Sequence, residues 1–494
     1  MRASEQRLIC GDCLTILPTL EERSAHCVVT SPPYFALRSY LPKDHPDKGK
    51  EIGSEPTPEA FIETMVRVFR EVRRVLRDDG VCFVNLGDSY NAGTRVDRKF
   101  KREAATKNHG YWSNDQIMQR VNVEDMATGQ LLNIPHRVAE ALRADGWIWR
   151  QTIVWAKRSP MPESVQGWRW TRCRVKVRGH QRDVGYSNST DGRPQSDSRH
   201  TGPYENGKWS DCPGCPKCTP NGGYVLRRGS GRCTTAHEYI FILTRTSRYF
   251  WDSEQSKEPQ EQSGIVRQKY GYKHFWGNII DHNQHIEKRQ HDDAKSYGPE
   301  DHPGTGRNPR SVWTLSSEPT SEHHFATFPS ELVRRCLSAG VSGGGCCPEC
   351  GAAWAPVVDV FGGLIGQGWT DHGADIEMGS RQCLRADGGD TPYTRNHLGY
   401  RPTCTCGKTE SSPCTVLDPF AGIGTVAQVA RHMGHNSISV ELNPKYVEIA
   451  RERVLETPRC FLRMGAMPAM RLDQAGLFDD LAEQSAIRNL QSKI

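Results

Sequence analysis

The chain lacks a long apolar run, since no stretch approaches the ~20 consecutive apolar residues of a membrane-spanning helix. The opening segment, MRASEQRLICGDC, lacks the apolar core of a signal peptide, so we expect a cytoplasmic protein without membrane association. A strong excess of one charge is also absent, because 64 Lys and Arg stand against 58 Asp and Glu, a net charge of +6. Nucleic-acid binding would therefore depend on local basic patches.

Cysteine, in contrast, is abundant, with 18 residues in a chain of 494. Without a secretion signal, metal binding explains this abundance better than disulfides do. The triplet Cys212, Cys215 and Cys218 has the spacing of ligands that share one tetrahedral zinc ion, with either Cys173 or Cys233 as the fourth. Cys347 and Cys350 with Cys404 and Cys406 predict a second, zinc-ribbon-like site, with Cys346 as a spare candidate. Reduced cysteines without metal are the alternative. All-thiolate sites would be structural, because they leave no open coordination position.

Apolar segments alternate between strand-like and helix-like periodicity. The pattern predicts strands at 25–30, 81–86, 147–155, 238–244, 415–417 and 437–441, and helices at 61–76, 133–144, 426–433 and 444–454. We expect Gly80 to end the first helix and Asn133 to cap the second. Alternation of this kind implies an α/β fold with a mostly parallel sheet covered by helices on both faces.

Composition divides the chain further. We expect the first half of the core at 1–160, an insert at 161–235, a return to the core at 236–340 with a polar insertion at 253–310, a Cys/Gly-rich insert at 341–413, the second half of the core at 414–460, and a tail at 461–494. No motif is readable in the tail, and the polar insertion predicts a loop.

Two motifs follow apolar strands. Thr30-Ser31-Pro32-Pro33-Tyr34 places a hydroxyl, a carbonyl and an aromatic ring on one rigid turn. Asp418–Gly424 (DPFAGIG) is a glycine loop before a predicted helix, and Glu441 ends the following strand, where an acid can bind both hydroxyls of a ribose. Tight structural turns and a solvated strand end are the alternatives.

Together these motifs resemble the amino-methylating DNA methyltransferases, which transfer a methyl group from S-adenosylmethionine to an exocyclic nitrogen of a base. The catalytic turn precedes the cofactor loop by about 390 residues, an order similar to that of the circularly permuted beta class. The resemblance covers roughly residues 6–92, 131–178, 211–252 and 307–455. It implies a Rossmann-like, doubly wound sheet in which the two loops meet at the switch point.

The resemblance also implies cofactor-binding roles. The glycine loop would hold the methionine part of S-adenosylmethionine, Glu441 the ribose, and Asp12 the adenine amino group. Phe328 belongs to the segment 324–329 (HFATFP), which would close over the cofactor. The complete expected cofactor set is Asp12, Phe328, Asp418, Pro419, Phe420, Gly422, Gly424, Glu441 and Asn443. By itself, Asp12 is equally typical of a turn or a helix cap.

An exocyclic amine is a poor nucleophile, because its lone pair is delocalised into the base. Two acceptors for its N–H groups would favour a tetrahedral nitrogen in line with the donor methyl. We expect Ser31 Oγ and the Pro32 carbonyl to be these acceptors, Pro32 and Pro33 to fix the turn, and Tyr34 to stack on a base flipped out of the duplex. Methylation of the cytosine ring is excluded, because the turn carries Tyr34 where that chemistry needs a cysteine.

Residues 168–178 mix arginines with tryptophans, and Arg227, Arg228 and Arg232 follow the first cysteine triplet. Such patches suit phosphate and base contacts, although a charge run is often only a solvated face. Beside a zinc module they predict a target-recognition region, and the basic segment 95–107 predicts a loop near DNA.

The resulting hypothesis is a site-specific methyltransferase acting on double-stranded DNA, with a cognate restriction endonuclease of a restriction-modification system as a candidate partner. The serine of the turn favours cytosine N4, and adenine N6 is the alternative. RNA or protein as substrate, or a catalytically idle zinc-containing DNA-binding protein, are further alternatives.

Overall fold

The computed structural model describes part of the chain. The described residues are 4–36, 39–42, 44–91, 123, 126–160, 163, 165–176, 209–259, 306–318, 328–361 and 394–457. The basic segment 95–107, most of the polar insertion 253–310 and the tail 461–494 lie outside them. The chain divides into two compact units, which we call unit 1 (Met1–Arg158 with His237–Ile494) and unit 2 (Ser159–Ala236). The domain boundaries expected within unit 1 stay a prediction.

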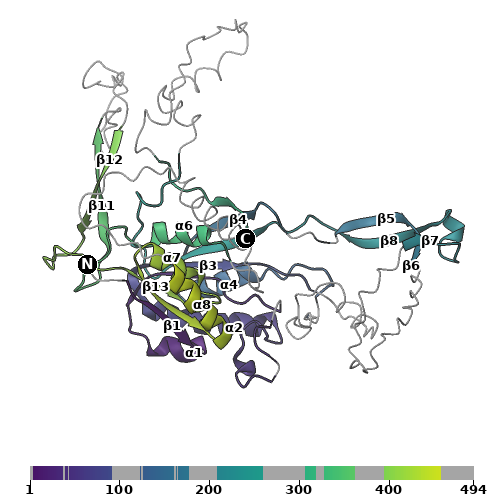
Figure 1. Ribbon diagram of the computed structural model, residues 1–494, viewed down its shortest axis with the longest axis horizontal. Coiled ribbons are helices and arrows are strands. Elements are labelled where there is room, and N and C mark those ends of the chain that lie inside the picture. The colour runs from purple at the N-terminus through teal and green to yellow at the C-terminus, as the bar shows by residue number, and fades with distance from the viewer. Residues whose placement is uncertain are drawn as a thin grey trace, which may run out of the picture. The chain divides into compact units, whose positions relative to one another are not determined.

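Unit 1 is built on an eight-stranded sheet (Figure 1). Its strands, in chain order, are β1 (Gln6–Cys10), β2 (Ala25–Thr30), β3 (Leu76–Leu86), β4 (Ile148–Lys157), β9 (His237–Thr244), β10 (Val312–Leu315), β13 (Thr415–Asp418) and β14 (Asn436–Glu441). In space their order is β1-β14-β13-β2-β3-β9-β4-β10. Only β9 runs antiparallel to its neighbours, β3 and β4, in this sheet. The expected mostly parallel, doubly wound fold is therefore confirmed.

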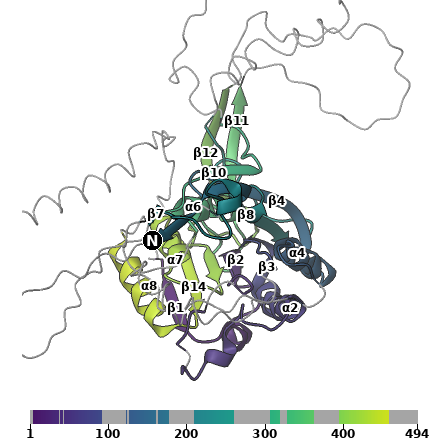
Figure 2. The ribbon, with the colours of Figure 1, turned by 90° about the vertical axis from the view of Figure 1, so that its right-hand side faces the viewer.

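Helices cover both faces of this sheet. They are α1 (Cys13–Ile16), α2 (Pro58–Val75), α4 (Ile134–Ala144), α6 (Ser330–Gly340), α7 (Thr425–His432) and α8 (Pro444–Glu456), with 3-10 turns at Leu17–Thr19 and Lys48–Lys50. Figure 2 shows α2 and α4 on one side of the strands and α6, α7 and α8 on the other. In the described part of the chain, no helix is both long and apolar enough to cross a membrane.

The alternation of buried side chains along the central strands explains this arrangement. Val28 of β2 belongs to one hydrophobic cluster, which includes Phe61 and Met65 of α2. Its neighbour Val29 belongs to a second cluster, which includes Leu332 of α6 and Val426 of α7. Because successive residues of a strand point to opposite faces, a strand that is apolar throughout requires helices on both sides.

Two local predictions differ from the structure. Gly80 does not end the first helix: α2 ends at Val75, and Gly80 lies inside β3. A Cβ atom at Gly80 would lie 2.9 Å from the carbonyl oxygen of His26 in β2, so the glycine allows close approach of the strands rather than a helix stop. Asn133 precedes α4 as expected, but its side chain makes no capping hydrogen bond and its φ is 56°.

Smaller sheets carry the cysteine-rich segments. In unit 1, β11 (Trp354–Phe361) pairs with β12 (Thr394–Pro402). In unit 2, β5 (Gln166–Arg172) pairs with β8 (Tyr224–Gly231), and β6 (Arg174–Lys176) pairs with β7 (Trp209–Asp211). The 3-10 turn Thr219–Asn221 precedes β8.

Candidate active site

The catalytic turn and the glycine loop leave adjacent parallel strands. Cys27 and Val28 of β2 pair with Val416 and Leu417 of β13. At the carboxyl ends of these strands the hydroxyl of Thr30 donates a 2.7 Å hydrogen bond to the buried carboxylate of Asp418. The fold therefore brings together two loops that are 388 residues apart at this bond.

One pocket is lined by both loops. Its walls include the predicted site residues Asp12, Ser31, Pro32, Pro33, Tyr34, Phe328, Pro419, Phe420, Gly422, Glu441 and Asn443. The other lining residues include Tyr40, Leu41, residues 50–52 and Tyr446. The parallel strands thus gather the predicted residues from both ends of the chain at one edge of the sheet, as expected for a switch point.

The glycine loop is held by hydrogen bonds from its backbone amides to two carboxylates. Asp418 accepts a hydrogen bond from the Phe420 amide at 3.1 Å, and the Gly422 amide donates to Glu441 Oε2 at 2.8 Å. Gly424 has φ 78° at the start of α7, and a Cβ atom there would lie 2.8 Å from the Cβ of Ala450 in α8. Gly424 does not line the pocket, so its observed role is to permit the close packing of loop and helix.

The two acids of the pocket region, Asp418 and Glu441, both have raised pKa values. Burial raises the pKa of Asp418 to about 7, against the hydrogen bonds from Thr30 and Phe420. Burial also raises the pKa of Glu441 to about 7, with a smaller contribution from the negative charge of Asp418. Glu441 additionally accepts the Asn443 amide through Oε1 at 2.8 Å. Each Glu441 oxygen keeps a lone pair, so the carboxylate can still accept hydroxyl groups in the pocket.

Asp12 and Asn443 combine a capping role with a place in the pocket wall. Asp12 is the N-cap of α1 and accepts the Leu14 amide at 3.0 Å, which is the structural alternative considered from the sequence. Asn443 is the N-cap of α8, accepts the Lys445 amide at 3.0 Å and donates to the Tyr40 carbonyl at 2.9 Å. Phe328 lines the pocket, whereas residues 324–327 of the expected closing segment lie outside the described residues.

Three polar side chains behind the catalytic turn were not predicted from the sequence. The Tyr34 hydroxyl donates to Glu238 Oε2 at 2.6 Å, and Lys157 Nζ donates to Glu238 Oε1 at 2.5 Å. Asn85 Nδ2 donates to the Tyr34 hydroxyl at 2.9 Å, to Glu238 Oε2 at 2.8 Å and to Ser31 Oγ at 3.4 Å. Burial raises the pKa of Tyr34 well above its usual range, with the Glu238 charge as the second cause. This network fixes the Tyr34 ring and orients the Ser31 hydroxyl.

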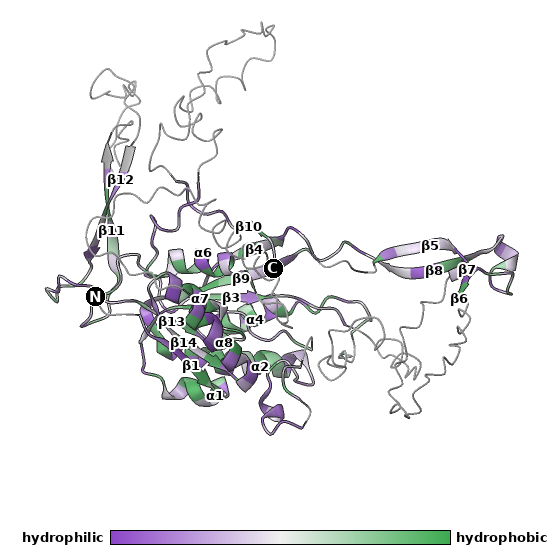
Figure 3. Cartoon of the chain, viewed as in Figure 1, coloured by the Kyte–Doolittle hydropathy of each residue, from purple (hydrophilic) through white to green (hydrophobic). Residues whose placement is uncertain are grey.

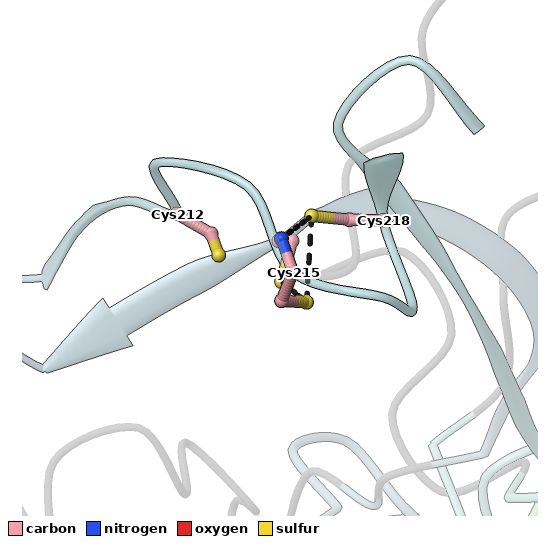
Figure 4. Close-up of side chains that lie close together, drawn as sticks. Cys212, Cys215 and Cys218 are labelled. Carbon is pink, nitrogen blue, oxygen red and sulfur yellow. Dashed lines mark hydrogen bonds between the residues drawn. The ribbon is translucent and has the colours of Figure 1, made fainter. Parts of the chain in front are cut away.

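Four thiols meet in unit 2. The sulfur atoms of Cys173, Cys212, Cys215 and Cys218 all lie within 4.8 Å of one another, and we call this group the first cysteine cluster. Figure 4 shows the Cys215 and Cys218 sulfurs facing each other, 3.5 Å apart, with Cys212 beside them. Cys173, rather than the exposed Cys233, completes the group. Four thiolates at this spacing fit a tetrahedral zinc ion.

The second cysteine cluster lies in unit 1 and consists of Cys347, Cys350, Cys404 and Cys406, whose sulfurs also lie within 4.8 Å of one another. A third group, His26 with Cys346 and Cys414, is close enough to hold a metal ion. However, His26 Nδ1 accepts the Thr415 amide at 3.0 Å, and its Nε2 lies 2.8 Å from the Gly351 carbonyl. Both ring nitrogens are therefore occupied by the backbone, and this group is a structural connection.

Comparison with known proteins decides the family. A family model for N6 and N4 methyltransferases, described as DNA methylase, matches residues 25–347 and 413–452. The chain belongs to this DNA methylase family. The resemblance read from the two motifs is therefore confirmed, and the chain is an S-adenosylmethionine-dependent DNA amino-methyltransferase.

The curated relatives of this methylase are type II methyltransferases. M.Cfr9I of Citrobacter freundii is 24% identical over 456 residues, which are 92% of this chain and 90% of the relative. M.SmaI of Serratia marcescens is 24% identical over 449 residues, which are 91% of this chain and 90% of the relative. Among solved structures, the cytosine-N4-specific PvuII DNA methyltransferase is 11% identical with a TM-score of 0.42, covering 93% of this chain and 89% of its own.

Proposed function

We propose that this methylase transfers a methyl group from S-adenosylmethionine to the exocyclic N4 of a cytosine flipped out of double-stranded DNA. The observation that carries the proposal is the common pocket of the catalytic turn and the glycine loop at the ends of β2 and β13. Adenine N6 is the alternative target, and the serine at the head of the turn is the reason for preferring cytosine.

The donor set of the pocket fits S-adenosylmethionine. The Glu441 carboxylate, which retains free lone pairs, would accept the ribose hydroxyls, and Asp12 would accept the adenine amino group. The glycine loop, flanked by Asp418 and Phe420, would hold the methionine part. Bound there, the cofactor supplies an electrophilic methyl group on a sulfonium ion.

The catalytic turn would prepare the base nitrogen for attack. Ser31 Oγ and the Pro32 carbonyl would accept the two N–H groups of the amine, which favours a lone pair directed away from the ring. The Asn85 amide donates to Ser31 Oγ and so leaves the remaining lone pair of that oxygen for the substrate. Tyr34, held by Glu238 and Asn85, would present its ring to the flipped base.

We further propose that both cysteine clusters bind structural zinc, one ion each, and that unit 2 contains the target-recognition region. The type II names of the relatives support a cognate restriction endonuclease as a functional partner.

Nucleoside mass spectrometry tests this function. Plasmid DNA lacking methylation is incubated with the purified protein and S-adenosylmethionine, digested and analysed. N4-methylcytosine is the expected product, N6-methyladenine would change the target base, and the absence of any methylated base would refute the proposal.

Ser31→Ala should lower kcat about 100- to 1,000-fold, the usual effect of removing one hydrogen bond made mainly in the transition state. The affinity for S-adenosylmethionine should change less than about twofold, since Ser31 would contact the base rather than the part of the cofactor that the glycine loop would hold. Single-turnover kinetics and calorimetry measure the two quantities, and an unchanged kcat would refute the assignment of the catalytic turn.

A further inference from the structure

The ribbon formed by β5 and β8 in unit 2 has two chemically different faces. Its register pairs Trp168 with Arg228, Arg169 with Arg227, and Trp170 with Leu226. Directly paired residues of antiparallel strands share a face, and successive residues alternate between faces. One face therefore carries Trp168, Trp170, Leu226 and Arg228. The other carries Arg169 and Arg227, with Thr171 and Val225 beyond them.

The aromatic face exposes large side chains. Trp168 is 67% exposed and Trp170 is 54% exposed, although both belong to a regular strand. The guanidinium of Arg228 lies over the Trp168 ring, 4.8 Å from its centroid. Stacking of this kind restricts the rotamers of the arginine and leaves its planar donors available at the ring edge. The face thus presents a pre-oriented cation beside an apolar surface.

The opposite face carries an uncompensated repulsion. Arg169 and Arg227 stand directly across from each other, an arrangement that destabilises a ribbon in isolation. Among the described residues, no carboxylate forms an ion pair with Arg169, Arg227 or Arg228. The other arginines in the described part of unit 2 are paired: Arg172 and Arg174 lie 3.3 and 3.6 Å from Asp211, and Arg232 pairs with Glu163.

Charge counting supports an anionic partner for this unit. Residues 159–236 contain 13 Lys and Arg and 6 Asp and Glu, a net charge of +7, whereas the entire chain carries +6. A zinc ion with four thiolates would contribute −2 and leave the unit clearly basic. Figure 3 shows a hydrophilic stretch within β8, the strand that contains Arg227 and Arg228. The positive charge of the chain is therefore concentrated in the unit that contains the ribbon.

We propose that the β5–β8 ribbon enters the major groove of duplex DNA with separate roles for its two faces. Arg228, supported by Trp168, reads a base edge, and guanine is the base that offers two acceptors to a guanidinium. Arg169 and Arg227, one on each strand, extend to the phosphates on the two sides of the groove and set the position of the ribbon. The proposal rests on DNA methylation as the function and assigns the recognition chemistry within unit 2.

The test begins by sequencing the positions that the wild-type protein methylates in plasmid DNA. A duplex with that site, its single-base-pair variants and a duplex of unrelated sequence then serve as binding probes across a range of salt concentrations. The double variant R169Q/R227Q should lose affinity by a similar factor on every duplex. Its slope of log K against log salt should shrink by about 1.8, because two phosphate contacts are lost.

R228Q should behave differently. Discrimination at one base pair of the site should fall about 5- to 150-fold, while affinity for the unrelated duplex and the salt slope change little. K217Q removes one exposed positive charge from unit 2 outside the ribbon and is the matched control, for which neither quantity should change. Zinc content, measured for each variant, reports whether unit 2 is still folded.

An unchanged salt slope in R169Q/R227Q would overturn the proposal, and so would a uniform loss of affinity across all duplexes in R228Q. Tighter binding of single-stranded DNA or RNA than of any duplex would also overturn it, by assigning the tryptophans to base stacking. If the wild-type protein methylates no DNA, the proposed function fails instead. The salt slope on the unrelated duplex still tests the phosphate contacts in that case.

Discussion

The first and second cysteine clusters have the same four-thiol composition, but different parts of the molecule hold them. In the first cluster, the Cys212 amide donates to the Cys173 carbonyl at 2.8 Å, and the Cys173 amide donates to the Gly223 carbonyl at 2.8 Å. These partners all belong to unit 2. A metal ion in this cluster would therefore join the ends of two small two-stranded sheets, β5–β8 and β6–β7, which have few apolar side chains to bury.

The second cluster is joined to the methylase core. The His26 ring links β2 to the Gly351 carbonyl, next to Cys350, and to the amide of Thr415, the first residue of β13. Arg77 Nη1 donates to the Cys350 carbonyl at 3.0 Å, and the Tyr400 hydroxyl donates to the buried Asp252 at 2.9 Å. The second cluster is therefore connected to β13, the strand that leads into the glycine loop. Clusters of the same four-thiol composition thus lie in two settings, one held within unit 2 and the other joined to the strand before the glycine loop.

Cys347→Ser should have the largest effect on stability. Cys347 is buried, and loss of its thiolate should release about one zinc ion per chain and lower the unfolding free energy of the core on the order of 4 kcal/mol. The affinity for S-adenosylmethionine should fall with it, because β13 loses its support. Zinc analysis, chemical denaturation and calorimetry measure these changes. Zinc loss with unchanged stability and cofactor affinity would break the proposed link between this cluster and the core.

Cys215→Ser should show the reverse pattern. It should also release about one zinc ion per chain, but cofactor affinity should stay within about twofold of wild type. Affinity for a duplex containing the site that the wild-type protein methylates should fall about 100-fold, towards the affinity of non-specific binding. A matching loss of cofactor affinity would show that the two units are coupled and would remove the distinction between the clusters.

The sequence predicts the core well because each strand and helix has its own local pattern. The predicted strand at 25–30 coincides with β2, and the predicted helix at 444–454 lies within α8. Strands β1 (QRLIC) and β10 (VWTL) were missed because five and four residues are too few for a distinct periodicity, and helix α6 was not predicted either. Gly80 was misinterpreted because glycine is favoured both where two strands approach closely and where a helix ends. The sequence alone does not distinguish these two cases.

The site could be predicted only where its residues form contiguous motifs. Ser31–Tyr34 and Asp418–Gly424 are such motifs, and the structure places both at one pocket, although Asp418 and Gly424 are not among its lining residues. Asn85, Glu238 and Lys157 come from β3, β9 and β4, and no sequence spacing relates them. Their one available signal was a polar residue near the end of an apolar strand, as Asn85 is in β3. That signal indicates that the residue lies near the site, but it does not identify the side chains that the residue contacts.

Asn85→Ala tests a residue of unit 1 that contacts the catalytic turn but neither cysteine cluster. Loss of the amide that donates to Ser31 and Tyr34 should lower kcat about 10- to 100-fold, while cofactor affinity and DNA affinity change little. Asn85→Asp should be more impaired than Asn85→Ala, because a carboxylate cannot donate and would lie against the Glu238 carboxylate. A merely structural role predicts lower thermal stability in both variants with kcat unchanged at permissive temperature, and that result would contradict a positioning role.

The smallest expected effect is a pH dependence confined to the core. The pKa of Glu441 is raised to about 7, so its ionised form is disfavoured in the folded protein without cofactor. The pKa of this carboxyl group is near 4.5 in the unfolded chain and about 7 in the folded protein. The stability that neutral Glu441 contributes is therefore fully present below pH 4.5 and is lost as the pH rises through 7. Asp418, with its pKa also raised to about 7, acts in the same direction. The melting temperature of the cofactor-free protein should therefore fall between pH 5 and pH 8.

Cofactor affinity should change in the opposite direction. S-adenosylmethionine carries a sulfonium charge and ribose hydroxyls, and an ionised Glu441 is the better partner for both. For one carboxyl group with a pKa of about 7, affinity should rise about fourfold between pH 6.5 and pH 8. Glu441→Gln is the matched control, because the amino group of the cofactor titrates equally in both proteins and cancels in the comparison. Cys215→Ser should retain the full pH dependence of cofactor affinity, since its cluster belongs to unit 2. A flatter pH profile of cofactor affinity in that variant would mean that unit 2 helps to set the charge of the cofactor pocket.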